Sequence, residues 1–416
     1  MLTTHWHRPF DQADYYFVVG NRKTYSRTSA IEWANGNMEL IELYWMDEVW
    51  SNMDLTRPPA GSWNELMRTR CHQVRSKASI FGIAFSGGYD SQTILDHCIM
   101  NNILVDDIQI NHKTFGSHPE FKSAVNTANY TKQHHYPKLN IHTIDIGIDY
   151  LLNIYQAGGN NWIENEHLTE LKFTKQARSS LINFNIGHTK TLDLVNRVVV
   201  EGHEKPRLFI HDGWWVMAMH DGVLDHTFNT PFENFYISRE LPELHLKQIW
   251  MMIDWMESQP FDTLSKLEEF LHFVQKNLDN NVNEQWNLAV GRNRVRHVNS
   301  WDLDLMLKHS CGGGIYSPDT VDLFTRHPHV RELLQVETWE NNSLEFIKQY
   351  PKTFVDPEDF AQFSSTRSIH VGTQRYPINV GLAKNIWTRR YPIKPVEPGK
   401  NNSSVLAGER SDLLHN

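Results

Sequence analysis

Short apolar runs alternate with amphipathic stretches through the middle of the chain. The run Ser79–Phe85 is apolar enough for a buried strand, and helical spacing of apolar residues follows it from Gln92 to Met100. The alternation then recurs and predicts further strands at Asp107–Ile110, Leu139–Ile146 and Arg197–Val200, with helices at about 118–133 and 162–181. Strands that alternate with helices form right-handed βαβ units. This region therefore predicts an α/β fold with a parallel sheet and helices on both faces.

The flanking regions show mainly helical spacing. Before the α/β region, apolar residues fit a helix over Ser29–Trp50 and another over Trp63–Ser76, where Ser62 and Glu65 match a capping box. After residue 233 the spacing predicts helices over 241–255, 264–278, 301–307 and 330–350. We therefore expect an N-terminal helical cap (1–78), an α/β domain (79–232), a largely helical C-terminal region (233–392) and, because it is rich in Pro, Gly, Ser and Asn, a mobile tail (393–416).

Composition narrows the class without indicating a chemistry. The 416 residues carry 40 Lys+Arg and 49 Asp+Glu, a net charge of −9, which argues against a broad nucleic-acid face. The three cysteines, Cys71, Cys98 and Cys311, exclude a disulfide framework and an all-cysteine zinc site, and they fit a reducing cytoplasm. No apolar run approaches the roughly 20 residues of a membrane span, so no membrane partner is expected.

The most informative segment is SGGYDS, Ser86–Ser91, between the first predicted strand and the first helix. Gly87 and Gly88 let the backbone turn sharply and bring several N–H groups toward one point. These groups and the helix N-terminus form an anion site, to which the Ser86 and Ser91 hydroxyls add donors. Ligands of open α/β sheets also lie at the carboxyl ends of strands. The loop therefore predicts a phosphate site.

Asp90 needs an explanation, because a carboxylate beside a phosphate is repulsive. Two roles would explain the Asp90 carboxylate at this position. Asp90 holds a Mg²⁺ ion that bridges phosphate oxygens, or it caps the helix and ties the loop. The sequence leaves both open.

The same string resembles the SGGxDS signature of the PP-loop ATP pyrophosphatases, a group that includes asparagine synthetases, argininosuccinate and GMP synthetases and tRNA-modifying enzymes. The resemblance covers about residues 79–215 and implies an adenine nucleotide alpha hydrolase-like, Rossmann-like fold that binds ATP and Mg²⁺. Such enzymes cleave ATP between the α and β phosphates, adenylate a substrate and release pyrophosphate. By this resemblance Ala84 and Ile110, at the ends of the first two strands, would line the adenine pocket.

A second loop follows the fourth predicted strand, with the sequence EGHEKPR at residues 201–207. In asparagine synthetases the comparable strand end carries Gly-Asp-Gly-x-Asp-Glu, which helps to hold the nucleotide, Mg²⁺ and the acyl-adenylate. The resemblance implies that Gly202 lies near the nucleotide and that Glu201 or Glu204 supplies a metal ligand. Lys205 would neutralise phosphate charge in the transition state. The family's aspartates are absent, and a solvated charged turn is the alternative.

Three features of related PP-loop enzymes are absent from this sequence, which narrows the class of enzyme. Position 2 is Leu2, where glutamine-hydrolysing asparagine synthetases have a nucleophilic cysteine, and residues 1–78 are too short for their glutaminase domain. Ammonia would then come from solution or from a separate protein, or another amine would serve. No CxxC pair, usual in thiolating PP-loop enzymes, occurs.

We therefore expect an ATP-dependent ligase that joins a small carboxylate or amide-type substrate to ammonia or an amine, with Asp90, Glu204 and Lys205 in catalytic roles. A nucleotide-binding module without turnover and a nucleic-acid base-modifying enzyme are the alternatives. The basic run Arg292–His297 fits the latter, but the net acidity does not favour it.

Overall fold

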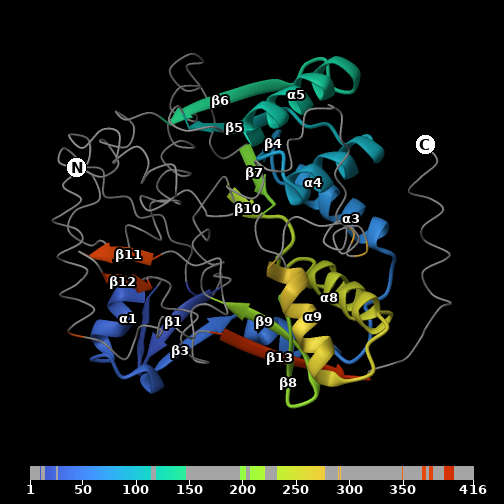
Figure 1. The fold of residues 1–416 in the computed structure, drawn as a ribbon. Helices are drawn as coiled ribbons and strands as arrows, with labels where there is room; N and C mark the ends of the chain where they lie inside the picture. The colour runs from blue at the N-terminus through green and yellow to red at the C-terminus, as the bar shows by residue number, and fades with distance from the viewer. Residues whose placement is uncertain are drawn as a thin grey trace.

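The computed structural model describes residues 10, 15–24, 27–113, 119–146, 197–202, 207–220, 232–276, 289, 291, 349, 368–371, 374–377 and 388–397. Its centre is a five-stranded parallel sheet (Figure 1). The sheet order is β10-β7-β4-β5-β6, and every neighbouring pair is parallel. The strands are β4 (Ile80–Ala84), β5 (Asp107–Lys113), β6 (Asn140–Ile146), β7 (Arg197–Glu201) and β10 (Phe232–Asn234). The predicted parallel sheet is confirmed, and its four predicted strands are all present.

The order of the strands determines where a ligand can approach. The chain adds β5 and β6 on one side of β4 and then returns to add β7 and β10 on the other side. The strand order therefore reverses between β4 and β7. Open α/β sheets bind ligands outside the carboxyl ends of the strands, at such a reversal.

Three helices pack with this sheet. They are α3 (Trp63–Ser76), α4 (Tyr89–Met100), which connects β4 to β5, and α5 (Pro119–His134), which connects β5 to β6. The predicted capping box of α3 is confirmed: the Glu65 N–H donates to Ser62 Oγ over 3.2 Å, and the Ser62 N–H donates to Glu65 Oε2 over 2.8 Å. The expected helix at about 162–181 lies outside the described residues, so helices on both faces stay a prediction.

The N-terminal part is not the helical cap that the spacing predicted. It contains a three-stranded antiparallel sheet of order β2-β1-β3, together with short helices. Its elements are β1 (Tyr15–Val19), β2 (Arg22–Thr24), α1 (Arg27–Trp33), the 3₁₀ helix η1 (Met38–Leu40), β3 (Ile41–Trp45) and α2 (Asp47–Ser51).

The predicted helix over Ser29–Trp50 is therefore wrong, for two physical reasons. Asn35 and Gly36 have positive φ and end α1 in a turn. Beyond the turn, Ile41, Leu43 and Trp45 are buried and alternate with more exposed residues, which is the period of a strand.

The C-terminal region is also less helical than expected. The helices α8 (Pro242–Glu257) and α9 (Leu264–Lys276) match the predicted ones to within about two residues. Strands that the spacing did not predict accompany them. They are β11 (Ser368–Val371), β12 (Gln374–Pro377) and β13 (Thr388–Pro395). Two further strands that the spacing did not predict, β8 (Arg207–His211) and β9 (Trp214–His220), lie within the predicted α/β domain, residues 79–232.

A tight turn joins two of these strands, and a third corrects an expectation. Asp212 and Gly213 both have positive φ and form the tight turn between β8 and β9. β13 pairs with β9 and crosses residue 393, where a mobile tail was expected, and Ile393 is fully buried. The helices expected at 301–307 and 330–350 lie, apart from residue 349, outside the described residues.

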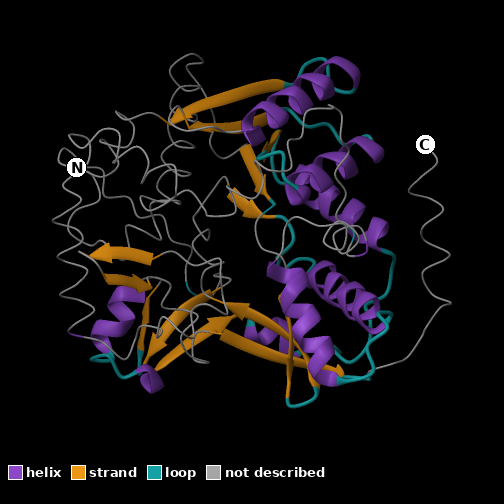
Figure 2. Cartoon of the chain, in the orientation of Figure 1, coloured by secondary structure: helices purple, strands orange, loops and turns teal. Residues whose placement is uncertain are grey.

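Figure 2 shows the helices and strands of the described residues. Their buried side chains form two clusters. One contains the parallel sheet with α3, α4 and α5, and the other contains the N-terminal sheet, β8, β9, β13, α8 and α9. α8 belongs to both, because Leu244 lies in the first cluster and Leu246 in the second. No helix among the described residues is long and apolar enough to cross a membrane.

Candidate functional site

The SGGYDS loop lies between β4 and α4, at the carboxyl edge of the parallel sheet. α4 begins at Tyr89, three residues before the predicted start, and Gly88 is its N-cap with an extended backbone (φ −77°, ψ 170°). The loop therefore leads directly into the first turn of a 12-residue helix. The unpaired N–H groups and the dipole of such a turn favour an anion.

Gly87 has a structural requirement for glycine. Its φ is +75°, which side chains disfavour, and a Cβ there would lie 3.1 Å from the Ala124 Cβ on α5. The loop consequently rests on the first half of α5, and α4 and α5 together determine its position.

The two serine hydroxyls converge at this turn. Ser86 Oγ accepts a hydrogen bond from the Gly88 N–H over 3.2 Å and lies 3.3 Å from Ser91 Oγ. Ser91 is buried, and its hydroxyl also lies 3.3 Å from the Gly88 carbonyl oxygen. Ser86 is exposed. The Ser86 and Ser91 hydroxyls and the Gly88 N–H therefore lie together at one helix N-terminus.

Asp90 is the second residue of α4. Gly88, two residues earlier, occupies the N-cap position of the helix. The Asp90 carboxylate lies in the first turn, where the helix dipole stabilises negative charge. The backbone carbonyl of Asp90 accepts a hydrogen bond of 2.9 Å from the Tyr236 hydroxyl. Both roles expected for the Asp90 side chain, holding a cation and tying the loop, stay predictions.

The end of β7 lies against the same turn. Glu201, the last residue of β7, is opposite Ala84 in register and is 1% exposed. A Cβ at Gly202 would lie 2.8 Å from the Ser91 nitrogen and 2.9 Å from the Asp90 carbonyl carbon. The structure therefore places Glu201 and Gly202 beside the loop. Glu204 and Lys205 lie outside the described residues, so their roles stay predictions.

The two residues expected near adenine lie at the level of the loop. Ala84 is the last residue of β4 and is partly exposed. β5 continues to Lys113, three residues beyond its predicted end, and Ile110 is buried in the core. The Phe85 N–H donates to the Gln109 carbonyl over 2.8 Å, which brings Ile110 level with the start of the loop. Nearby, His112 stacks on Phe121 of α5, with the ring centroids 3.9 Å apart.

The carboxylates at this turn suit a cation that a nucleotide also binds, and not one that protein side chains bind alone. Within the described part of the chain, no group of three or more His, Cys, Asp or Glu side chains is arranged to hold a metal ion. Asp90 and Glu201 are the two predicted metal residues in this part. A Mg²⁺ ion in a nucleotide site usually needs one or two protein carboxylates, because phosphate oxygens and waters supply its other ligands.

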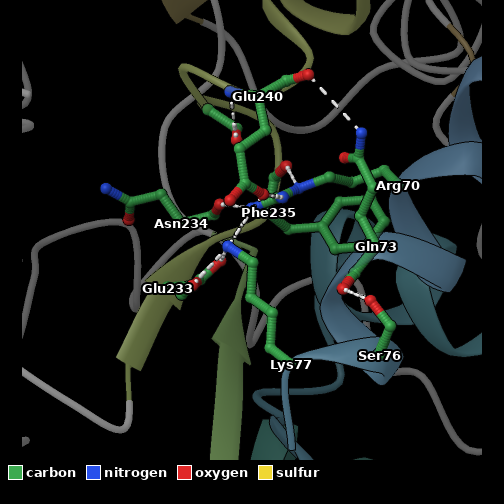
Figure 3. Close-up of polar contacts among 9 residues, drawn as sticks. Arg70, Gln73, Ser76, Lys77, Glu233, Asn234, Phe235 and Glu240 are labelled. Atoms are coloured by element: carbon green, nitrogen blue, oxygen red, sulfur yellow. Dashed lines mark hydrogen bonds and ion pairs between the residues drawn. The ribbon is translucent and has the colours of Figure 1, made fainter.

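A charged cluster behind the loop was not found from the sequence (Figure 3). Arg70 of α3 is 1% exposed, and its guanidinium contacts the Glu233 and Glu240 carboxylates at 3.2 Å each. Lys77 Nζ lies 2.6 Å from Glu233 Oε1 and 2.8 Å from Glu240 Oε2. Burial alone would raise the pKa of the Glu240 carboxyl, but hydrogen bonds and charges from Lys77 and Arg70 hold it below its ordinary value.

No local signal could have revealed this cluster, because its basic and acidic residues are more than 150 positions apart. A contact between two cysteines that are 27 positions apart was also not found from the sequence. Cys71 and Cys98 are both buried and unbridged, and their sulfurs are 3.7 Å apart between α3 and α4. The hydrogen bond with Cys71 and burial raise the pKa of the Cys98 thiol, which keeps it in the unreactive protonated form.

No protein-family model and no curated protein matches the chain. Among solved structures it is similar to the NH3-dependent NAD synthetase of Campylobacter jejuni, at 15% identity and a TM-score of 0.27, over 68% of this chain and 96% of that one. It is also similar to the NMN synthetase of Francisella tularensis, at 14% identity and a TM-score of 0.25, over 58% of this chain and 100% of that one. Neither similarity is strong enough to show the family of this chain.

Proposed function

We propose that this protein is an ATP-dependent ligase that activates a substrate by adenylation and releases pyrophosphate. The observation that carries the proposal is the position of the SGGYDS loop. It follows the central strand of a parallel sheet, leads into a helix N-terminus and faces the end of β7 at the reversal of strand order. This is the arrangement expected for the phosphates of a nucleotide.

The contacts of Ser86, Gly88 and Ser91 support a phosphate-binding role for the loop. The Gly88 N-cap leaves the first N–H groups of α4 available to phosphate oxygens, and the adjacent Ser86 and Ser91 hydroxyls can donate to the same group. Asp90, with Glu201 or Glu204, would hold a Mg²⁺ ion that neutralises the charge of the leaving pyrophosphate. Lys205 would add a positive charge on the same side.

The proposed chemistry proceeds in two displacements. A substrate carboxylate or amide oxygen attacks the α-phosphorus, the bond to the bridging oxygen of the β phosphate breaks, and pyrophosphate leaves. Ammonia or an amine then attacks the activated carbon, loses a proton and displaces AMP. The loop contributes by holding the β and γ phosphates so that the attacking and leaving oxygens are in line.

The finer assignment, an asparagine-synthetase-like enzyme, is supported by the SGGYDS string. Its substrates would be a small carboxylate or amide and an amine, with ammonia supplied from solution or by a separate protein.

The test is the product formed from ATP. The full-length protein is incubated with α-³²P-ATP, Mg²⁺, ammonium and a panel of small carboxylic acids, and AMP, ADP and pyrophosphate are quantified. The proposal predicts equal amounts of AMP and pyrophosphate with at least one acid. Formation of ADP and phosphate alone would contradict adenylation, and ATP binding with no turnover across the panel would favour the non-catalytic alternative.

A pair of variants links the result to the loop. Asp90→Asn removes the first-turn carboxylate of α4 and should lower turnover by about 100-fold or more, as expected when a charge-stabilising group is lost. Glu243→Gln removes the first-turn carboxylate of α8 and serves as the matched control. Equal activities of the two variants would contradict the role of Asp90.

A further inference from the structure

A side chain from the segment that follows the edge strand of the sheet contacts the first turn of α4. Tyr236 follows the edge strand β10, is 2% exposed, and donates its hydroxyl hydrogen to the Asp90 carbonyl oxygen over 2.9 Å. Asp90 is the second residue of the helix whose N-terminus ends the phosphate loop. We infer that Tyr236 is a positioning residue for the phosphate loop, which it holds in the conformation that binds the nucleotide. This inference rests on the function proposed above.

The backbone before Tyr236 is held by Arg70. The Arg70 guanidinium donates from Nε to the Phe235 carbonyl over 3.0 Å and from one terminal nitrogen to the Asn234 carbonyl over 2.8 Å (Figure 3). Its remaining contacts are the Glu233 and Glu240 carboxylates, which flank the same segment. A planar guanidinium with several donors fixes direction as well as distance. Arg70 therefore sets the path of residues 233–235 relative to α3.

The ring of Tyr236 and its neighbour are held as well. The Trp63 ring of α3 lies parallel to the Tyr236 ring, at an interplanar angle of 6° and a centroid distance of 6.4 Å. The Phe235 N–H donates to the Glu201 carbonyl over 3.0 Å. The segment is thus joined to α3, to the end of β7 and to the start of α4.

These contacts leave the hydroxyl of Tyr236 little freedom, so its hydrogen bond restrains the first turn of α4. Gly202, just after β7, also approaches the backbone of Asp90 and Ser91 closely. Both the end of β7 and Tyr236 therefore contact this turn. Because an anion site of backbone N–H groups depends on their direction, loosening the turn should weaken phosphate binding.

The experiment compares two tyrosine variants of the full-length protein. Tyr236→Phe removes the hydroxyl and keeps the ring beside Trp63. Tyr136→Phe is the matched control, because the buried Tyr136 hydroxyl donates to the Ile103 carbonyl over 2.8 Å, just beyond the opposite end of α4. Both variants lose one buried tyrosine–carbonyl hydrogen bond and should unfold at similar, slightly lower denaturant concentrations.

The readout is the Kd of ATP with Mg²⁺, and separately of inorganic pyrophosphate, measured by calorimetry. We expect Tyr236→Phe to raise both Kd values roughly five- to tenfold, the factor that corresponds to one neutral hydrogen bond. Tyr136→Phe should leave both unchanged. Wild-type binding with equal Kd values for the two variants would overturn the role of Tyr236 alone, whereas a wild type that binds neither probe would overturn the proposed function together with it.

Discussion

At the scale of single residues, the contacts of two glycines explain why the loop can exist. Gly87 packs on α5 and Gly202 packs on the first turn of α4, and neither position has room for a side chain. The hydroxyl-bearing residues of the loop are identifiable from the sequence because they form one continuous string. Gly202 is less conspicuous, since its importance comes from a contact with residues more than 100 positions earlier in the chain.

Gly202→Ala should weaken nucleotide binding without removing any polar group. The new Cβ would stand 2.8 Å from the Ser91 nitrogen, so the first turn of α4 has to move away from it. We expect a loss of about 1–3 kcal/mol in binding, roughly a tenfold or greater rise in the Kd of ATP with Mg²⁺.

Gly213→Ala is the control for this variant. Gly213 also has a positive φ, but nothing lies within 4 Å of a Cβ there, and its turn joins β8 to β9. It should lower stability by about 1 kcal/mol through backbone strain and leave the Kd unchanged. A Gly202→Ala protein that binds ATP as the wild type does would show that the β7 exit does not shape the site.

His245 should make the stability depend on pH. It is fully buried on α8 beside Trp50, and burial lowers the pKa of its imidazole to about 3. As pH falls from about 6.5 toward 3, the unfolded chain binds a proton that the folded chain does not, so the free energy of unfolding decreases. Above pH 6.5 the imidazole is neutral in both states, and this contribution no longer changes with pH.

The measurement is urea unfolding of the wild type and of His245→Phe between pH 7 and pH 5. In the wild type, His245 should make the free energy of unfolding decrease by up to about 1.4 kcal/mol for each pH unit below pH 6. The variant should have a shallower slope by that amount. Parallel slopes in the two proteins would mean that His245 takes up a proton in the folded state.

At the scale of elements, the opposite edge of the parallel sheet is held by buried charges. Asp107 begins β5 and Arg197 begins β7, and their side chains form an ion pair across β4, which lies between them. Gly82 of β4 is opposite Asp107 in register and carries no side chain, so the two charged groups can meet. His142 and Asn140 of β6 contact the same carboxylate at 3.4 and 3.0 Å.

Asp107→Asn should destabilise the fold strongly. Burial would raise the pKa of the Asp107 carboxyl, but its hydrogen bonds and the Arg197 charge lower it below the usual value. The native state therefore contains the ionised form at neutral pH, and removal of that charge leaves the buried Arg197 unpaired. We expect a loss of about 3–5 kcal/mol in the free energy of unfolding.

Asp262→Asn provides the comparison, because Asp262 pairs with Lys266 over 2.8 Å on an exposed helix end. Its loss should leave the free energy of unfolding nearly unchanged, because exposed ion pairs contribute little. Urea unfolding monitored by circular dichroism measures both. Similar small effects of the two substitutions would contradict a structural role for the charges under the sheet.

At the scale of the whole molecule, two cores share α8, and the last described strand completes the second one. β13 pairs with β9 along its length, Ile393 is buried, and Lys394 Nζ contacts Glu257 Oε2 of α8 at 2.8 Å. The same Glu257 carboxylate accepts a hydrogen bond of 2.7 Å from the Trp215 indole. Composition alone suggested a mobile tail from residue 393, because that segment is rich in Pro, Gly, Ser and Asn.

Two truncations test whether the segment from residue 388 is a strand of the fold or a mobile tail. Removal of residues 398–416 leaves β13 intact, whereas removal of 388–416 unpairs one side of β9 and uncovers apolar side chains of the second core. We expect the protein that lacks residues 388–416 to have a Tm several degrees or more below that of the protein that lacks only 398–416, measured by scanning calorimetry. Equal Tm values for the two proteins would indicate that β13 adds nothing to the fold.

The sequence by itself determined the parallel sheet strands, α3 with its capping box, and the SGGYDS loop, because their signals are periodicities and turn residues within about ten positions. It misassigned Ser29–Trp50, where apolar spacing fits a helix but the turn at Asn35 and Gly36 divides the segment. Tertiary structure alone decided that Gly202 and Tyr236 hold the start of α4 and that Arg70 holds Tyr236. Those contacts join residues more than 100 positions apart, and they depend on how the strands are ordered in the sheet, which no local pattern encodes.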